Sequence, residues 1–186
     1  MRTKLYLMLA IALFLLGGTA LAQEEPPKAE VFGGFSYMRT AGNTNVNGWT
    51  AQATFNLKSI VGLAADFGGN YQTKSDATGR PSANVFTFMF GPQVADRTGK
   101  ITGFAHALFG GARVGKGFAL GKGGVSATST NFAMMFGGGV DANINEKLAV
   151  RIFQVDYEII RANNAINVKE ARNNFRLAVG IVYKIK

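Results

Sequence analysis

The sequence predicts an all-β protein, an eight-stranded antiparallel up-and-down transmembrane β-barrel preceded by a signal-peptide helix. Three observations predict this fold. Apolar and polar residues alternate with a period of two in several stretches, which is typical of strands with one apolar face. Short and long connections alternate along the chain, as they do in barrels that cross a membrane. The 24 glycines of the 186 residues include several within apolar stretches, where they disfavour helices.

The N-terminal residues have the layout of a secretory signal peptide, for which we predict residues 1–22 and cleavage after Ala22. Two basic residues precede an apolar run over 5–16, and small residues follow it. About a dozen apolar residues are too few for a membrane anchor, because a spanning helix needs roughly 20. Residues 23–29 form a short leader, and 30–186 form one barrel domain. We expect no periplasmic peptidoglycan-binding domain after it.

The alternation is most regular in three stretches, which we predict as strands over 49–57, 61–71 and 174–185. Five further strands are expected over the ranges 30–39, 84–94, 101–112, 131–143 and 148–159. Both faces of 101–112 are small or apolar, so the pattern does not orient that strand. In 148–159 the apolar positions change phase, and this change predicts a β-bulge near Phe153.

The connections between these strands fall into two groups. The expected short turns cover 58–60, 96–100 and 145–147. The expected long, polar loops cover 40–46, 72–82, 113–130 and 161–172. Short periplasmic turns opposite long extracellular loops are typical of outer-membrane barrels, whereas a water-soluble barrel has no reason to segregate its loops. We therefore predict an exported protein of the bacterial outer membrane.

Alternation alone does not say which face is buried, and aromatic placement distinguishes the alternatives. A soluble barrel of the lipocalin type places its apolar side chains inside, and an outer-membrane barrel places them outside. If the short turns are periplasmic, each strand supplies one aromatic residue near the outer rim, as an interfacial girdle requires. The predicted girdle is Tyr37, Trp49, Tyr71, Phe86, Phe109, Phe132, Tyr157 and Phe175. The inner rim is sparser, with Phe55 and Tyr183.

The opposite face of the strands is polar, as expected of a lumen filled by side chains. Its predicted residues are Gln52, Thr54, Asn56, Asp66, Asn70, Thr87, Gln93, Asp141, Arg151, Asp156 and Arg176. The three aspartates should pair with the two arginines, because an unpaired buried charge costs several kcal/mol. An eight-stranded barrel is only wide enough for side chains to fill, which argues against a large open pore.

Neither catalysis nor a metal site is expected from the residue types. His106 is the one histidine of the chain, and Leu108 stands where a serine nucleophile could share its face. We therefore predict a structural role for His106 and no enzyme. The chain has no cysteine, and its acidic residues are spread over different strands, so no metal or other cofactor is predicted.

The net charge indicates an anionic partner. The chain carries +9, and removal of residues 1–22 with their two basic side chains leaves 9 − 2 = +7. Nucleic acid is a poor candidate, since export is predicted and no run of Lys and Arg is dense enough for a basic patch. Outer-membrane lipid and lipopolysaccharide are the expected partners. Nothing in the sequence indicates oligomerisation, and we expect a monomer.

The strand count, the loop alternation and the last strand together resemble the eight-stranded outer-membrane barrel families, similar to the OmpA transmembrane domain and the OmpX-like barrels of the porin family. Gly180, Tyr183 and Ile185 stand at the glycine and hydrophobic positions of the C-terminal signal that the barrel-assembly machinery reads. The chain departs from that signal by ending in Ile185-Lys186 instead of an aromatic residue.

The resemblance implies insertion by the barrel-assembly machinery and, first among the functions, a structural or surface-interaction role. Transport of small solutes or hydrophobic compounds is the alternative. A secreted, soluble lipocalin-like barrel that binds a ligand is a third possibility.

Overall fold

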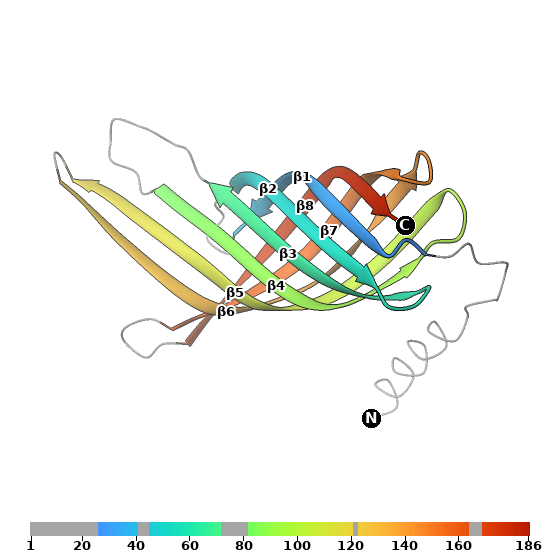
Figure 1. The fold of residues 1–186 in the computed structure, drawn as a ribbon. Helices are drawn as coiled ribbons and strands as arrows, with labels where there is room; N and C mark the ends of the chain where they lie inside the picture. The colour runs from blue at the N-terminus through green and yellow to red at the C-terminus, as the bar shows by residue number, and fades with distance from the viewer. Residues whose placement is uncertain (1–25, 41–44, 72–81, 121–122, 164–168) are drawn as a thin grey trace, which may run out of the picture.

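A computed structural model describes residues 26–40, 45–71, 82–120, 123–163 and 169–186, so the predicted signal peptide lies outside the described residues. The described residues fold into one closed antiparallel barrel (Figure 1). Its strands are β1 (Ala29–Arg39), β2 (Asn45–Asn56), β3 (Val61–Tyr71), β4 (Ser82–Asp96), β5 (Ile101–Leu120), β6 (Gly123–Asn143), β7 (Leu148–Asn163) and β8 (Lys169–Ile185).

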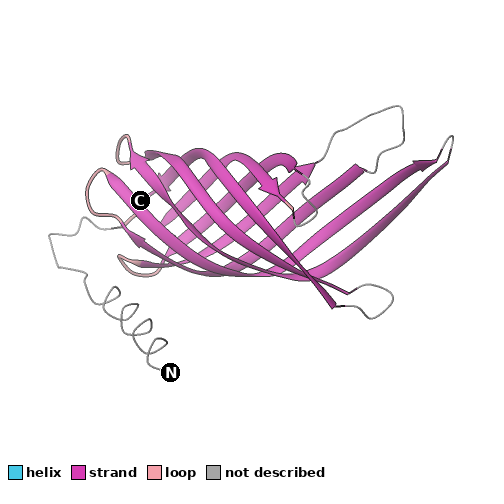
Figure 2. Cartoon of the chain, turned by 180° about the vertical axis from the view of Figure 1, so that it is seen from behind, coloured by secondary structure: helices cyan, strands magenta, loops and turns pink. Residues whose placement is uncertain are grey.

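Each strand pairs with its sequence neighbours, and the first and last strands close the wall. The β1–β8 pairing runs from Ala29 opposite Ile185 to Arg39 opposite Phe175. Seen from behind, the wall is a continuous set of tilted strands (Figure 2). Closure matters because a backbone group that faces lipid has no water to bind and needs a partner on the next strand. No helix in the described part of the chain is long and apolar enough to span a membrane.

The bulge predicted near Phe153 is confirmed. The β7–β8 register shifts between Arg151 and Gln154, and the β6–β7 register shifts between Val140 and Asp141. Ile152 and Phe153 consequently both face outward, although they are neighbours in sequence. The extra residue lets both Arg151 and Gln154 face the interior. The change of apolar phase in the sequence thus has a structural cause.

The long loop predicted over 113–130 is wrong, because most of it is strand. β5 continues to Leu120 and β6 begins at Gly123, and the two pair along their whole length. The loop predicted over 161–172 is also shorter, since β7 reaches Asn163 and β8 begins at Lys169. The apolar–polar alternation ends in these segments, but backbone pairing alone continues a hairpin outside lipid. Strand ends drawn from apolar–polar alternation therefore fall short of the true ends of β5, β6, β7 and β8.

The strand that the sequence could not orient is oriented by the structure. Thr102, Phe104, His106 and Leu108 face the interior, and Phe109 faces outward. The even-numbered positions from Thr102 to Leu108 thus line the interior.

Two interior aromatic rings lie over glycines of their own or a neighbouring strand. A Cβ atom added at Gly34 or Gly180 would lie 2.8 or 2.9 Å from the ring of Phe32. One added at Gly139 would lie 2.9 Å from the ring of Phe104. These glycines make room for large rings inside a narrow barrel.

Candidate functional site

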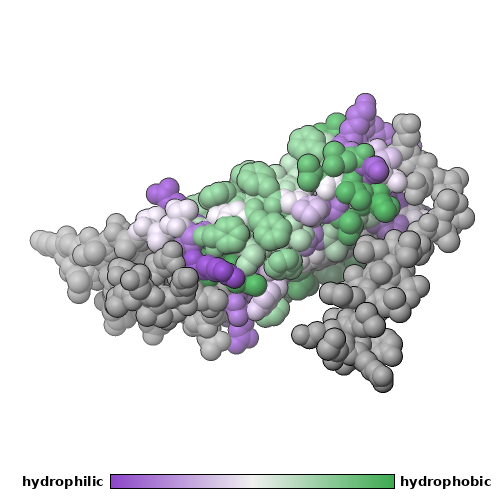
Figure 3. Space-filling model, turned by 90° about the horizontal axis from the view of Figure 1, so that it is seen from below, coloured by the Kyte–Doolittle hydropathy of each residue, from purple (hydrophilic) through white to green (hydrophobic). Residues whose placement is uncertain are grey.

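The outer wall is apolar and the interior is charged. Trp49, Phe55 and Leu63 are 45%, 60% and 51% exposed, whereas Asp66 and Arg176 are 0% exposed. Hydrophobic residues cover the middle of the face seen in Figure 3, and hydrophilic ones gather toward its ends. A soluble protein has the reverse arrangement. The wall is therefore built for contact with lipid.

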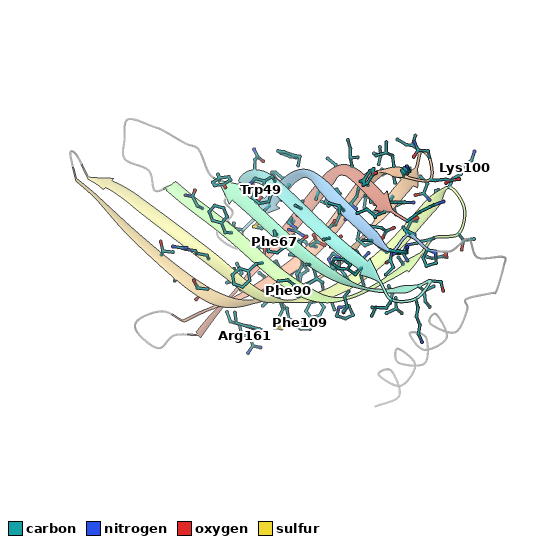
Figure 4. The ribbon with its side chains drawn as sticks, viewed as in Figure 1. Trp49, Phe67, Phe90, Lys100, Phe109 and Arg161 are labelled. Carbon is teal, nitrogen blue, oxygen red and sulfur yellow. The ribbon has the colours of Figure 1, made fainter. Side chains whose placement is uncertain are left out.

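All eight residues proposed for the aromatic girdle point away from the interior; Tyr37 and Tyr157 are half-buried and the others exposed. Two pairs are in ring contact, with centroid distances of 5.5 Å for Tyr71–Phe86 and 5.1 Å for Tyr157–Phe175. Trp49 and Phe109 lie in one band across the barrel with Phe67 and Phe90, which the proposed girdle did not include (Figure 4).

Arg176 is the centre of one interior cluster of charges. Its Nη1 and Nη2 donate to the two carboxylate oxygens of Asp66 at 2.8 and 3.0 Å. Its Nε donates to Oδ2 of Asp156 at 2.9 Å. Arg176, Asp66 and Asp156 are all fully buried, so charge-assisted hydrogen bonds replace the water that each charge has lost. This cluster joins three strands across the interior.

Arg151 is the centre of a second cluster, nearer the short turns. Its Nε and Nη2 donate to the two oxygens of Asp141 at 2.8 and 3.1 Å. Its Nη1 donates to Oε1 of Gln52 at 3.0 Å and to Oε1 of Gln154 at 2.6 Å.

His106 and Gln154 connect the two clusters. Nε2 of His106 lies 3.0 Å from Oδ1 of Asp156, and its Nδ1 lies 3.4 Å from Nε2 of Gln52. Gln154 donates to Oδ2 of Asp156 at 2.8 Å. The sequence analysis gave Gln154 no place in the interior, and it predicted a structural role for His106 without naming its contacts. The predicted bulge near Phe153 could have identified Gln154. After an extra residue in the strand, the even-numbered positions of β7 face the interior.

The remaining residues of the proposed lumen also face inward. Ser36 donates to Oδ1 of Asn70 at 3.0 Å, and Thr54 donates to Oε1 of Gln93 at 3.5 Å. Thr87 is buried.

A third group of polar residues lies at the short-turn end of the interior, and the sequence analysis predicted only part of it. Arg97 pairs with Glu30 at 2.9 Å and donates to Oδ1 of the half-buried Asn56 at 2.7 Å. Only Asn56 was expected to face the interior. Glu158, on the inner face of β7, is fully buried and was also missed.

The interior is not polar throughout, which corrects the expectation from sequence. A set of buried apolar side chains points inward from the half of the barrel near the long connections. Its members are Met38, Val46, Val85, Met89, Leu108, Ala112, Ala133, Met135 and Ile160. Nη2 of Arg176 contacts Sδ of Met135 at 3.2 Å, so the charged and apolar layers adjoin.

The described residues contain no group of three or more His, Cys, Asp or Glu side chains that could hold a metal ion. The polar partners of His106 in the described part of the chain are Gln52 and Asp156, and neither is a nucleophile of the serine or cysteine type. The chemistry that this arrangement supports is the filling and cross-linking of the interior by ion pairs and hydrogen bonds.

The three residues of the proposed assembly signal lie on both faces of β8. Gly180 is on the inner face beneath Phe32, whereas Tyr183 and Ile185 are exposed on the outer wall. Their recognition by the assembly machinery stays a prediction.

The closed eight-stranded wall, apolar outside and charged inside, defines a small outer-membrane β-barrel. No protein-family model matches the chain, and no curated protein matches its sequence.

Solved structures do share the fold. Ail, the attachment invasion locus protein of Yersinia pestis, matches with a TM-score of 0.63 and 13% identity over 86% of this chain and 99% of Ail. Neisserial surface protein A matches with a TM-score of 0.64 and 12% identity over 87% of this chain and 100% of that protein. The outer membrane protein OprG of Pseudomonas aeruginosa matches with a TM-score of 0.55 and 10% identity over 87% of this chain and 97% of OprG.

Proposed function

We propose that this outer-membrane barrel has a surface-interaction role and presents its long-loop end to molecules outside the cell. The observation that carries the proposal is the projecting β5–β6 hairpin, which extends beyond the rest of the wall (Figure 1). β6 runs from Gly123, but its pairing with β7 begins only at Phe132. The segment 123–131 therefore pairs with β5 and, within the described residues, has no strand partner on its other side.

An unpaired strand edge offers a row of backbone donors and acceptors to an extended segment of another protein. Most natural edges are shortened or covered to prevent such pairing. The length of this edge and its position outside the apolar wall favour a recognition surface. Its partner would be an external protein that contributes an extended segment.

Basic residues near the same end support a second contact, with anionic glycans. Arg39, Arg113 and Arg161 are exposed near the long connections, and Arg161 lies beside the aromatic band (Figure 4). Arginine binds phosphate and sulfate through its planar fork of donors. Lipopolysaccharide of the same membrane is the partner we propose for these residues. Ail, which has this fold, has been crystallised with the heparin analogue sucrose octasulfate.

The filled interior supports a surface role over conduction. A charged network and an adjoining apolar layer occupy the space inside the wall. We further propose insertion by the barrel-assembly machinery and a monomeric state.

Removal of the hairpin tip tests the proposal. Because Gly115 pairs with Thr128, residues 116–127 can be replaced by an Asn-Gly turn without changing the β5–β6 register. Vesicles carrying the intact protein should adhere to immobilised matrix proteins, and the shortened variant should lose that adhesion. Heat-modifiable migration on gels should be retained by both, which would show that the barrel still folds. Equal adhesion by the two proteins would contradict the proposed role.

The apolar layer of the interior favours one second candidate, the passage of a hydrophobic compound through the outer half of the barrel. The lining from Met38, Val46, Met89 and Leu108 suits an apolar solute, whereas the charged network below it does not. Uptake of an apolar dye into vesicles would test this function. Dye uptake that is lost on Leu108→Asp, with the barrel still folded, would favour it over the surface role.

A further inference from the structure

The short-turn end of the barrel has an unusual surface. Ile144 and Leu57 are 67% and 64% exposed, the highest values among the large hydrophobic residues of the described chain, and both lie in short turns. Ile101, at the third short turn, is 59% exposed. A turn that projected into water would be expected to carry polar residues. These exposed aliphatic side chains are therefore suited to an apolar contact.

Each of the three turns also carries an exposed lysine within three residues of its aliphatic side chain. Lys58 follows Leu57, Lys100 precedes Ile101, and Lys147 stands three residues after Ile144. Lys100 lies at the end of the barrel opposite the aromatic band (Figure 4). Within the described residues, Lys58 and Lys100 form no ion pair. We call these turn residues, Leu57, Lys58, Lys100, Ile101, Ile144 and Lys147, the lysine collar.

The acidic residues near the collar are already engaged. Glu30 pairs with Arg97, and Glu146 pairs with Lys186 at 2.7 Å. Asp96 accepts hydrogen bonds from the backbone and side chain of Thr98. The collar lysines thus have charge available for an external anion.

We propose that the lysine collar binds the phosphate groups of anionic glycerophospholipids in the periplasmic leaflet, with its aliphatic side chains inserted among the upper acyl chains. Long lysine side chains reach headgroup phosphates while their stems stay in apolar surroundings. Each lysine near an anionic surface contributes roughly a fivefold preference.

The arrangement of the collar favours lipid over a periplasmic protein. Its members come from the β2–β3, β4–β5 and β6–β7 turns, which are distributed around a closed barrel. A protein partner contacts one side of such a rim, whereas the lipid annulus surrounds it. At the short-turn end of Figure 3, hydrophobic and hydrophilic residues are mixed, as contact with both acyl chains and headgroups requires.

The depth of the β6–β7 turn in the membrane can be measured by tryptophan fluorescence, because Trp49 is the one tryptophan of the chain. In a Trp49→Phe background, Ile144→Trp places the single fluorescent tryptophan at the lysine collar. Phosphatidylcholines brominated near the headgroup should quench it about as strongly as they quench Trp49 in the unaltered protein at the other rim. Water-exposed emission that these lipids do not quench would overturn the proposal.

The choice of lipid is tested with Lys58→Gln, Lys100→Gln and Lys147→Gln combined in the full chain. Spin-labelled phosphatidylglycerol should associate with the unaltered protein in preference to spin-labelled phosphatidylcholine, and the triple variant should lose most of that preference. The comparison variant combines Arg39→Gln, Arg113→Gln and Arg161→Gln at the opposite rim. It should lose only the part of the preference that these phosphate-binding arginines contribute, a smaller part than the lysine variant loses. An unchanged preference in the lysine variant would overturn the proposal. Strong binding of soluble peptidoglycan fragments, in competition with the spin-labelled lipid, would also overturn the proposal.

Discussion

The guanidinium of Arg151 lies between two rings, with its Cζ 4.1 Å from the centroid of Phe32 and 4.1 Å from that of Phe104. The same group donates to both oxygens of Asp141. A planar cation can stack on two faces and fork to a carboxylate in its own plane at the same time. Arg151 therefore joins the apolar and ionic contacts of the interior.

Arg151→Lys should destabilise the barrel, although it keeps the charge. An ammonium group cannot stack between two rings and bind both oxygens of Asp141 together, and we expect a loss of about 2 kcal/mol. Urea unfolding in lipid vesicles measures the change. Arg113→Lys, at an exposed position on β5, is the control and should change stability by less than about 0.5 kcal/mol. An equal effect of the two substitutions would contradict the role assigned to the stacked geometry.

Arg151→Ala and Arg176→Ala should each raise ion conductance in planar bilayers. Removing Arg176 leaves Asp66 and Asp156 buried without their guanidinium, and unpaired charges draw water into the interior. The unaltered protein should conduct little, because the network and the apolar layer fill the barrel. Arg161→Ala on the outer face is the control and should leave conductance low. Unchanged conductance in both interior variants would count against a plug formed by this network.

The sequence predicts the facing of residues well where the two faces differ in chemistry. Leu63 and Asp66 are three positions apart, an odd number, so they lie on opposite faces of β3, and the structure places them outside and inside. The pattern carries no such information for β5, because Ala and Phe occur on both of its faces. Leu108 was therefore not recognised as part of an apolar interior layer.

Contacts between distant strands could not be predicted from local pattern. His106 and Asp156 are 50 residues apart. Both lie opposite Gly137 of the intervening strand β6, so their contact depends on the β5–β6 and β6–β7 registers and on the bulge in β7. The ends of β5 and β6 were missed for a different reason. Outside the lipid, backbone pairing suffices, and no apolar alternation marks the strand.

Gly180→Ala should weaken the β1–β8 seam. An added Cβ would overlap the carbonyl oxygen of Gly33 and lie 2.9 Å from the ring of Phe32. We expect a loss of about 1–3 kcal/mol from overpacking. Refolding of the purified protein into detergent measures this effect without the assembly machinery, which keeps it separate from any role of Gly180 in the assembly signal. Gly33→Ala is a matched control on the facing strand, because nothing lies within 4 Å of a Cβ there.

The contact between Glu146 and Lys186 should respond to acid. The hydrogen bond that Lys186 donates, together with its charge, lowers the pKa of the Glu146 carboxyl below its ordinary range, and Lys147 adds to the effect. Because the folded pKa is lowered, the contact stabilises the protein above the unfolded pKa and is lost as pH falls through the folded pKa. NMR titration of the carboxyl in micelles should show the lowered pKa in the unaltered protein. Lys186→Gln should return it most of the way to the ordinary range, and Lys147→Gln should move it less. A larger shift with Lys147→Gln would mean that the end of β8 is not held to the β6–β7 turn by this pair.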